Sequence, residues 1–439
     1  MNPAIQFLKR NHLDPETINT DRLMDIFAVE MEAGLSGRGS SLPMIPAYIP
    51  MDRPTPVNCS ALVLDAGGTN LRAAVVAFDS SGKPQIEKIE RTKMPGATEL
   101  VSAEVFFNSL ADFVAPLASD ATDLGFCFSY PAEITASCDA RLIQWTKQIQ
   151  VPEVVGKMIG SGLDTALLQR GHALRFTVLN DTVATLMAGK HSGNGGAHTA
   201  YAGFILGTGT NTAIMARHAR IKKIEGLPPD GCMAINVESG SFAKAPRSQF
   251  DIVFDATTTD TGTYAFEKMI SGAYLGGLGL TALQAAARDG LFTPPTAAKL
   301  LQWQELSNKD FDDFCAAPSE GATPFQALNL CTPDIEVIVT IGNAIYQRAA
   351  LLAAVNISSA IVETQKAGLT AGPVAMTIDG STFYRTRCAS FRQIIETNVA
   401  HLMEVRGIAY ELLESANAPV IGAAIAALAR RSQTPAGDR

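Results

Sequence analysis

The chain has 439 residues, of which 47% are hydrophobic and 18% are charged, as in an ordinary globular protein of two or three domains. Its 43 acidic and 35 basic residues give a formal net charge of −8, which argues against the broad basic face of a nucleic-acid-binding protein. The seven cysteines form no CxxC pair, the first ten residues lack an apolar signal core, and no apolar run approaches the roughly 18 residues of a membrane span. We therefore expect a cytoplasmic protein with reduced thiols that binds neither nucleic acid nor a membrane, and the sequence leaves a monomer and a homodimer equally open.

The first half of the chain alternates between helical and strand patterns. Apolar residues at helical spacing predict two helices, over 21–34 and about 103–117. The proline-rich stretch from residue 43 to residue 56 is expected to be a looping connector. Short apolar runs predict a β-hairpin over 61–78 and buried strands over 124–128 and 175–179.

The second half continues in the same way. Strands are expected over 201–206, 212–215 and 374–378. Helices are expected from residue 266 onward, over about 335–366 and over 421–428, and the tail 432–439 is expected to fray. Strands that end in polar residues, with helices between them, predict a layered α/β fold.

Two similar glycine turns lie between paired strands, Asp65-Ala66-Gly67-Gly68-Thr69-Asn70 and Gly207-Thr208-Gly209-Thr210-Asn211. Glycines let the backbone approach an anion and turn its N–H groups toward it, while Thr and Asn add neutral donors. One such turn is equally compatible with a plain hairpin. The repetition, together with a third strand that ends in Asp379-Gly380-Ser381, favours two halves around one nucleotide. The GxxxxGK[ST] motif, a helix-opening GxGxxG and HRD with DFG are absent from the sequence.

Seven motifs follow one another along the chain, at 64–72, 128–131, 145–147, 180–183, 207–211, 236–238 and 266–276. In these motifs the chain resembles the hexokinases common in eukaryotes, within the actin-like ATPase superfamily, and the resemblance covers nearly the whole chain. It implies a two-lobed α/β fold of the actin-like ATPase (ribonuclease H-like) type, each lobe a mixed β-sheet flanked by helices, with the active site in the interdomain cleft. It also implies a small domain of residues 60–182 plus 419–439 and a large domain of residues 1–59 plus 183–418.

The implied reaction is the Mg²⁺- and ATP-dependent transfer of the γ-phosphate to the 6-hydroxyl of a hexose, with glucose as the expected substrate. In such a transfer a carboxylate takes the proton of the hydroxyl, while positioning and electrostatics carry most of the catalysis. Asp181 is the expected general base, because it follows a buried strand beside Asn180 and is similar in place to the base of the family. Lys147 is expected to belong to the catalytic site as well. Without the surrounding motifs, Asp181 or Thr182 would be interpreted as the cap of the helix that follows.

A hexose is a ring of hydroxyl groups, so its site needs carboxylates, amides and hydroxyl side chains that donate and accept hydrogen bonds. By resemblance, the two lobes supply these groups from opposite sides of the cleft, and sugar binding pulls the lobes together. The predicted sugar-binding residues are Ser129, Tyr130, Thr146, Lys147, Asn180, Asp181, Asn211, Glu238 and Glu267.

For the nucleotide, the resemblance places the phosphates of ATP between the two glycine turns. Asp65 is expected to hold Mg²⁺ through water, since a hard cation prefers oxygen ligands and keeps several waters. The six histidines show no metal-ligand spacing. The predicted nucleotide-binding residues are Asp65, Gly67, Gly68, Thr69, Asn70, Arg72, Gly207, Thr208, Gly209, Gly380, Ser381 and Gly422.

The chain departs from the family pattern at three places. Tyr130 replaces the usual Phe after the serine of the sugar motif, and Ser239 replaces a Trp that would pack beside Glu238. The segment 415–421 replaces a glycine- and serine-rich turn at the adenosine end of the site. Tyr130 and Ser239 leave open a kinase for mannose, fructose or an amino sugar, and the 415–421 segment leaves open a non-catalytic sugar-binding regulator. An actin-like structural ATPase is a third alternative, but it would not need the sugar-type residues around 129–147 and 236–267.

Overall fold

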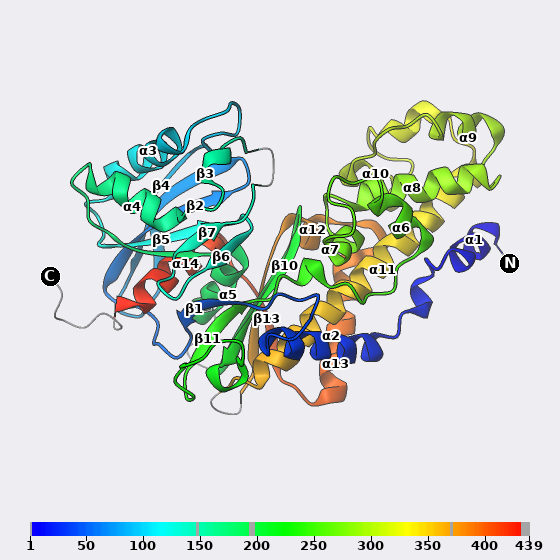
Figure 1. The fold of residues 1–439 in the computed structure, drawn as a ribbon. Helices are drawn as coiled ribbons and strands as arrows, with labels where there is room; N and C mark the ends of the chain where they lie inside the picture. The colour runs from blue at the N-terminus through cyan, green and yellow to red at the C-terminus, as the bar shows by residue number, and fades with distance from the viewer. Residues whose placement is uncertain (1, 146–148, 193–197, 369–371, 432–439) are drawn as a thin grey trace.

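The computed structural model describes the chain except for residues 1, 146–148, 193–197, 369–371 and 432–439, and it forms two lobes (Figure 1). One lobe is built on a five-stranded sheet and the other on a six-stranded sheet. Helix α5, Asp181–Ser192, lies near the middle of the molecule, where the lobes meet (Figure 1). The tail that was expected to fray lies outside the described residues.

The small lobe has the strand order β4-β3-β2-β5-β8. Strand β3 is antiparallel to β2 and β4, whereas β5 is parallel to β2 and β8. The bounds are β2 Cys59–Gly67, β3 Asn70–Phe78, β4 Pro84–Lys93, β5 Asp123–Phe128 and β8 Arg175–Leu179. A separate two-stranded sheet pairs β6, Ala132–Ile134, with β7, Ala140–Leu142.

Alternate residues of β2 enter two different hydrophobic cores, because successive side chains of a strand point to opposite faces. Leu62 and Leu64 pack in the core that includes α3, Ala103–Val114, and α4, Ile159–Leu168. Ala61 and Val63 pack in the core that includes α5 and α14, Ala418–Ala429. Helices therefore cover both faces of this sheet, which explains the unbroken apolar run of residues 61–64 in β2.

The large lobe has the strand order β1-β11-β10-β9-β12-β13. The first four strands in this order are antiparallel neighbours, whereas β12 runs parallel to both β9 and β13. The bounds are β1 Ile45–Pro50, β9 Ala200–Leu206, β10 Thr210–Arg217, β11 Cys232–Asn236, β12 Val374–Asp379 and β13 Tyr410–Glu414.

Helix α11, Thr332–Gln365, runs the length of the large lobe, with α6 and α8 to α10 near one end (Figure 1). It is long and apolar enough to cross a membrane, but 67% of its most apolar window is buried inside the protein. We therefore interpret α11 as a core helix, in agreement with the packing role that its small residues predict.

The remaining helices complete the large lobe. Their bounds are α1 Pro3–Arg10, α2 Thr20–Leu35, α6 Gln249–Asp255, α7 Ala265–Ile270, α8 Leu275–Arg288, α9 Pro294–Leu300, α10 Asn308–Ala316, α12 Ser381–Arg385 and α13 Phe391–Arg406. Short 3₁₀ helices lie at Pro15–Thr17, Ala115–Leu117, Pro152–Val154, His218–Arg220, Ser239–Ser241, Pro324–Leu328 and Cys388–Ser390.

Each helix and strand expected from the described sequence is present, with small shifts at its ends. The looping connector predicted from residue 43 to residue 56 is wrong at β1. This strand lies at the edge of the sheet and pairs with β11 alone, and an edge strand tolerates prolines such as Pro46 and Pro50. The sheets assign strands to lobes in keeping with the predicted domains, whose limits stay a prediction.

Helices α5 and α14 pack so closely that their contact excludes a side chain. A Cβ atom at Gly422 of α14 would overlap the backbone carbonyl of Ala184 in α5. A Cβ atom at Gly125 of β5 would likewise overlap the carbonyl of Ala423. Gly422 is buried at this contact, and its predicted role toward the nucleotide stays a prediction.

We expect Gly422→Ala to lower the free energy of unfolding by about 1–3 kcal/mol, because the added methyl group overpacks the α5–α14 contact. Alanine favours a helix by about 1 kcal/mol over glycine, so a loss of stability would come from packing. Chemical denaturation measures the effect, and Gly39→Ala is the control, since no atom lies within 4 Å of a Cβ there. Equal stability of the two variants would contradict the prediction.

Candidate active site

A pocket of about 590 Å³ opens between the lobes at the start of α5. The small lobe contributes segments that follow its strands: Ser129, Tyr130, Pro131, Gln144, Trp145, Asn180, Asp181 and Thr182. The large lobe contributes the turn after β9 and segments near α7: Ile205, Thr208, Gly209, Thr210, Asn211, Glu238, Thr259, Asp260, Tyr264, Glu267, Ala273 and Tyr274. Most of these side chains are polar, so the pocket suits a ligand that offers many hydrogen-bonding groups.

The pocket brings together seven of the nine residues that were predicted to bind a sugar. They are Ser129, Tyr130, Asn180, Asp181, Asn211, Glu238 and Glu267. The other two, Thr146 and Lys147, lie outside the described residues. The individual roles of all nine stay predictions.

Two parallel strands bring the polar groups of the small lobe to one edge of its sheet. Strand β5 ends just before Ser129 and strand β8 just before Asn180. Asn180 Oδ1 accepts a hydrogen bond of 2.9 Å from the N–H of Thr182 and so caps α5. The alternative interpretation, in which Asp181 or Thr182 caps this helix, is therefore wrong. Asp181 lines the pocket instead, and the Thr182 hydroxyl donates to its Oδ1 at 3.3 Å.

Three side chains of the large lobe form a hydrogen-bonded cluster in the pocket region. Asn211 Nδ2 donates to Asn236 Oδ1 at 2.8 Å and to Glu238 Oε1 at 3.3 Å, and Asn236 Nδ2 donates to the same Oε1 at 2.7 Å. Asn211 Oδ1 accepts from the backbone N–H of Thr212 at 2.7 Å and of Ser239 at 3.2 Å. These contacts fix the orientation of the Asn211 amide and the Glu238 carboxylate before any ligand binds.

The backbone of Glu238 is left-handed, with φ 55° and ψ 49°, which is uncommon for a residue other than glycine. Such conformations gather at functional sites. Burial raises the pKa of the Glu238 carboxyl group, the hydrogen bond from Asn236 lowers it, and the charge of Asp181 raises it again, so that the net pKa lies above its ordinary value. The ionised Glu238 carboxylate therefore lowers the free energy of unfolding at neutral pH.

The first glycine turn joins β2 to β3, with Gly68 in the left-handed region at φ 71°. Gly67, Thr69 and Asn70 are exposed. The hydroxyl of Tyr130 donates to the carbonyl of Gly68, so this turn is tied directly to the wall of the pocket. Burial raises the pKa of the Tyr130 hydroxyl, which therefore stays protonated and remains a donor.

The second glycine turn joins β9 to β10 and is held from the side of α12. The Gly207 carbonyl accepts from the N–H of Gly272 at 2.8 Å and from the hydroxyl of Thr382 at 2.7 Å. Gly380 precedes α12 with φ 113°, and a Cβ atom there would overlap the end of β9. Only glycine fits this approach, so the turn, Gly380 and Ser381 form one continuous backbone surface.

Glu267 of α7 supports the same turn from the other side. Its Oε2 accepts from the N–H of Thr210 at 2.8 Å. The same oxygen would lie 2.6 Å from a Cβ atom at Gly209, so a larger residue there would displace Glu267. Thr208, at the tip of the turn, is exposed. A residue predicted to bind the sugar is thus in contact with the turn predicted to bind phosphate.

Asp65 and Arg72 face each other across β2 and β3 and form an ion pair. Arg72 Nε lies 2.7 Å and Nη2 lies 2.5 Å from Asp65 Oδ2. Asp65 is 3% exposed, and burial raises the pKa of its carboxyl group while Arg72 opposes that rise. Within the described ranges, no group of three or more His, Cys, Asp and Glu side chains is placed to hold a metal ion.

Sequence reasoning missed part of the pocket wall. Gln144, Trp145 and Tyr264 line the pocket but were not predicted as site residues, and Asn236 was placed in a motif without a role. Trp145 packs against Tyr130 with ring centroids 4.9 Å apart. A period or spacing does not show such contacts, because they join segments that are distant in the sequence.

We expect Glu238→Gln to raise the melting temperature above that of the wild type at neutral pH. The raised pKa means that the native carboxyl group keeps its proton more strongly than the unfolded one, so stability is lost as the pH rises above the ordinary value of 4.5. The difference should disappear below that pH, which melting curves from about pH 4 to about pH 8 would reveal. A wild type more stable than the variant at the upper end of this series would contradict the assignment.

Comparisons with known proteins identify the family. Two family models described as hexokinase match the chain, one over residues 4–191 and the other over residues 201–429. Hexokinase-1 of Spinacia oleracea is 31% identical over 411 residues, which cover 87% of this chain and 81% of the relative. Hexokinase-1 of Arabidopsis thaliana is 34% identical over 298 residues, which cover 64% of this chain and 59% of the relative.

Solved structures agree with the fold. A crystal structure of a hexokinase is 26% identical and has a TM-score of 0.79, with 98% of this chain and 100% of that chain covered. A hexokinase of Schistosoma mansoni complexed with glucose is 24% identical and has a TM-score of 0.76, with 97% and 99% covered. The predicted two-lobed fold and the predicted resemblance are confirmed. The chain belongs to the hexokinase family.

Proposed function

We propose that this hexokinase-family protein transfers the γ-phosphate of ATP to the 6-hydroxyl of a hexose, with glucose as the first substrate to test. The observation that carries this proposal is the pocket in which Asp181 of one lobe lies among hydroxyl-binding groups of both lobes. The two glycine turns border the same pocket, through Tyr130 on one side and through Thr208 and Gly209 on the other.

The polar groups of the pocket suit the hydroxyl groups of a sugar ring. Asn211 links the lobes, because its Nδ2 also lies 3.4 Å from Asn180 Oδ1, across the pocket from its partners in the large lobe. Asn211 and Glu238 are held in place by their neighbours, so these side chains lose little conformational freedom when a sugar binds between them. Ser129 and Glu267 complete the set from opposite lobes.

Asp181 is the general base of the proposed reaction. It is the first residue of α5 and lines the pocket, so its carboxylate lies where it can accept the proton of a bound sugar hydroxyl. The capping of α5 by Asn180 leaves the Asp181 side chain available to the pocket. As the lobes close, water leaves the site and wasteful hydrolysis of ATP is limited.

The turns fit the triphosphate of ATP, and the oxygen donors beside them fit Mg²⁺. Gly67, Thr69 and Asn70 are exposed at the first turn, as is Thr208 at the second, so their backbone N–H and side-chain donors are accessible to phosphate oxygens. Asp65 offers a carboxylate, the ligand type that Mg²⁺ prefers, and water and the phosphates would supply the other ligands. The ion shields the negative charge of the phosphates.

We expect Asp181→Ala to lower kcat for glucose phosphorylation by roughly 10²–10⁴-fold, because the variant lacks the group that accepts the hydroxyl proton. An assay of ADP release coupled to NADH oxidation measures the rate, and calorimetry of glucose binding shows whether the pocket is intact. Asp181→Asn, which keeps the shape of the side chain, should be as impaired as the alanine variant. Unchanged turnover in these variants would contradict the assignment of Asp181 as the general base.

Removal of divalent cations by a chelator should stop ADP formation, and added Mg²⁺ should restore it, because uncompensated phosphate charge would face Asp181 and Glu238. Chromatographic separation of ADP from ATP is the measurement, because the coupling enzyme of the NADH assay itself needs a divalent cation. Turnover that continues at an unchanged rate with excess chelator would contradict the metal requirement.

A further inference from the structure

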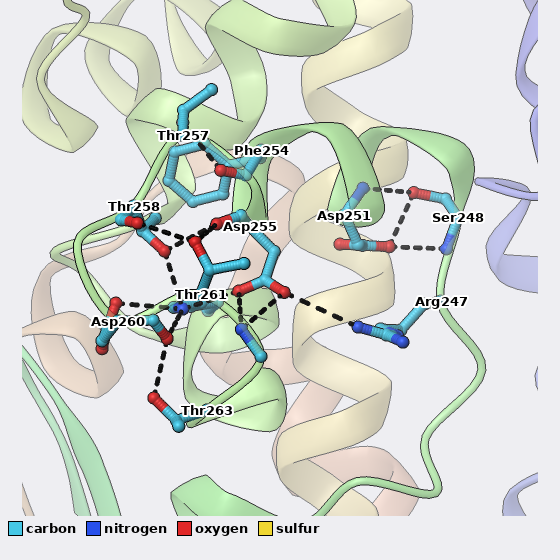
Figure 2. A network of polar contacts seen from close by, with 12 residues as sticks. Arg247, Ser248, Asp251, Phe254, Asp255, Thr257, Thr258, Asp260, Thr261 and Thr263 are labelled. Carbon is cyan, nitrogen blue, oxygen red and sulfur yellow. Dashed lines mark hydrogen bonds and ion pairs between the residues drawn. The ribbon is translucent and has the colours of Figure 1, made fainter.

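One wall of the pocket comes from a loop between α6 and α7, which we call the 256–264 loop. Three of its residues, Thr259, Asp260 and Tyr264, line the pocket. The loop contains no helix or strand. Its shape therefore depends on side-chain contacts at its base (Figure 2).

Lys268 of α7 supplies those contacts. It is 4% exposed, and its ammonium group lies 2.7 Å from Asp255 Oδ1, 2.8 Å from the Thr258 hydroxyl, 2.9 Å from the Asp260 carbonyl and 3.0 Å from Asp260 Oδ1. A lysine ammonium group has three N–H donors and no acceptor. Four oxygens, one from Asp255 at the end of α6 and three from Thr258 and Asp260 of the loop, therefore converge on a single buried cation.

Asp255 closes the loop from the opposite side. Both of its carboxylate oxygens accept from the Gly262 N–H, at 3.2 and 3.1 Å, and its carbonyl accepts from the hydroxyls of Thr258 and Thr261 (Figure 2). Burial raises the pKa of the Asp255 carboxyl group, but Lys268 and the Gly262 N–H lower it by more, so the net pKa lies below its ordinary value. The carboxylate is thus charged and paired at neutral pH.

The loop ends at Tyr264, whose backbone is left-handed with φ 51° and ψ 37°. Together with Glu238, it is one of two pocket residues that adopt this conformation without being glycine. Burial raises the pKa of the Tyr264 hydroxyl, and the Gln144 side chain of the small lobe interacts with this hydroxyl and lowers that pKa. Both residues line the pocket, so Tyr264 is a point where the two lobes meet.

We infer that Lys268 is a positioning residue for sugar recognition: it holds the 256–264 loop so that Asp260 and Tyr264 form a wall of the sugar pocket and Tyr264 meets Gln144 of the small lobe. This inference rests on the proposed function, since it deepens the account of the same pocket. Lys268 acts through the loop, so its loss affects the hexose more than the nucleotide, whose predicted contacts lie on the two glycine turns.

The test compares Lys268→Met, Lys268→Arg and the control Arg247→Met in the full-length protein. Arg247 also pairs with Asp255, at 3.8 Å, but its side chain is 42% exposed and Asp255 belongs to α6 rather than to the loop. We expect Lys268→Met to raise the Kd for glucose roughly tenfold, from the loss of a charged hydrogen-bonding group. Its KM for glucose should rise in parallel, with little change in KM for ATP. Lys268→Arg should restore part of the affinity, and Arg247→Met should behave as the wild type.

Calorimetry of glucose binding without nucleotide is the primary measurement, because it does not depend on turnover. If the wild type binds glucose but forms no ADP, the proposed function fails while the inference is still decided by the Kd values. If the wild type phosphorylates glucose and Lys268→Met keeps the wild-type Kd, the inference fails and the proposed function stands. An equal rise in KM for glucose and for ATP would also overturn it.

Two further variants guard against a general loss of folding. Lys268→Met removes the closer of the two cations beside Asp255, so the double variant Lys268→Met/Asp255→Asn also removes the carboxylate charge that Lys268 balanced. It should recover stability but not glucose affinity. Tyr264→Phe removes only the hydroxyl that meets Gln144, and we expect it to raise the Kd for glucose about threefold to tenfold. A wild-type Kd in both variants would overturn the inference.

Discussion

The position of helix α5 is the constraint on which the rest of the site depends. A Cβ atom at Gly203 of β9 would lie 2.6 Å from the backbone nitrogen of Leu186, and one at Gly422 of α14 would overlap the carbonyl of Ala184. Glycines of the large-lobe sheet and of α14 therefore let two elements approach the same helix at backbone distance. Asp181, the first residue of α5, is placed by packing rather than by its own contacts.

This packing explains how side chains of both lobes meet at the start of α5. The Asn180 cap fixes the first turn of α5, and the same Asn180 oxygen lies 3.4 Å from the Asn211 amide of the large lobe. Asn211 is in turn bonded to Asn236 and Glu238. A chain of side chains thus runs from the helix start into the large-lobe sheet, and a sugar that binds along it contacts both lobes. This continuity supports the proposal that the lobes close on the sugar.

Sequence patterns predicted the regular elements and the motif residues of the pocket well, because apolar periodicity and glycine turns are local signals. They failed where the outcome depends on sheet position, as at β1, whose prolines are tolerated only at an edge. They also failed at the α5 cap, since Asn180, Asp181 and Thr182 all have capping side chains and only the geometry distinguishes them. The 256–264 loop could not be predicted, because Lys268 reaches oxygens spread over the loop without any repeating pattern.

The acidic side chains around the pocket restrict the net charge of the ligands that can bind there. Burial raises the pKa of Asp65, Glu238 and Asp379, and the charge of Asp181 adds to the rise at all three, so acidic side chains of both lobes repel one another. Arg72 opposes the rise at Asp65 and at Asp379. A triphosphate adds more negative charge to this region, and neutral N–H donors alone do not remove the repulsion. The proposed magnesium ion and the neutral sugar are therefore the ligands that this arrangement of charges favours, and an anionic sugar would be repelled.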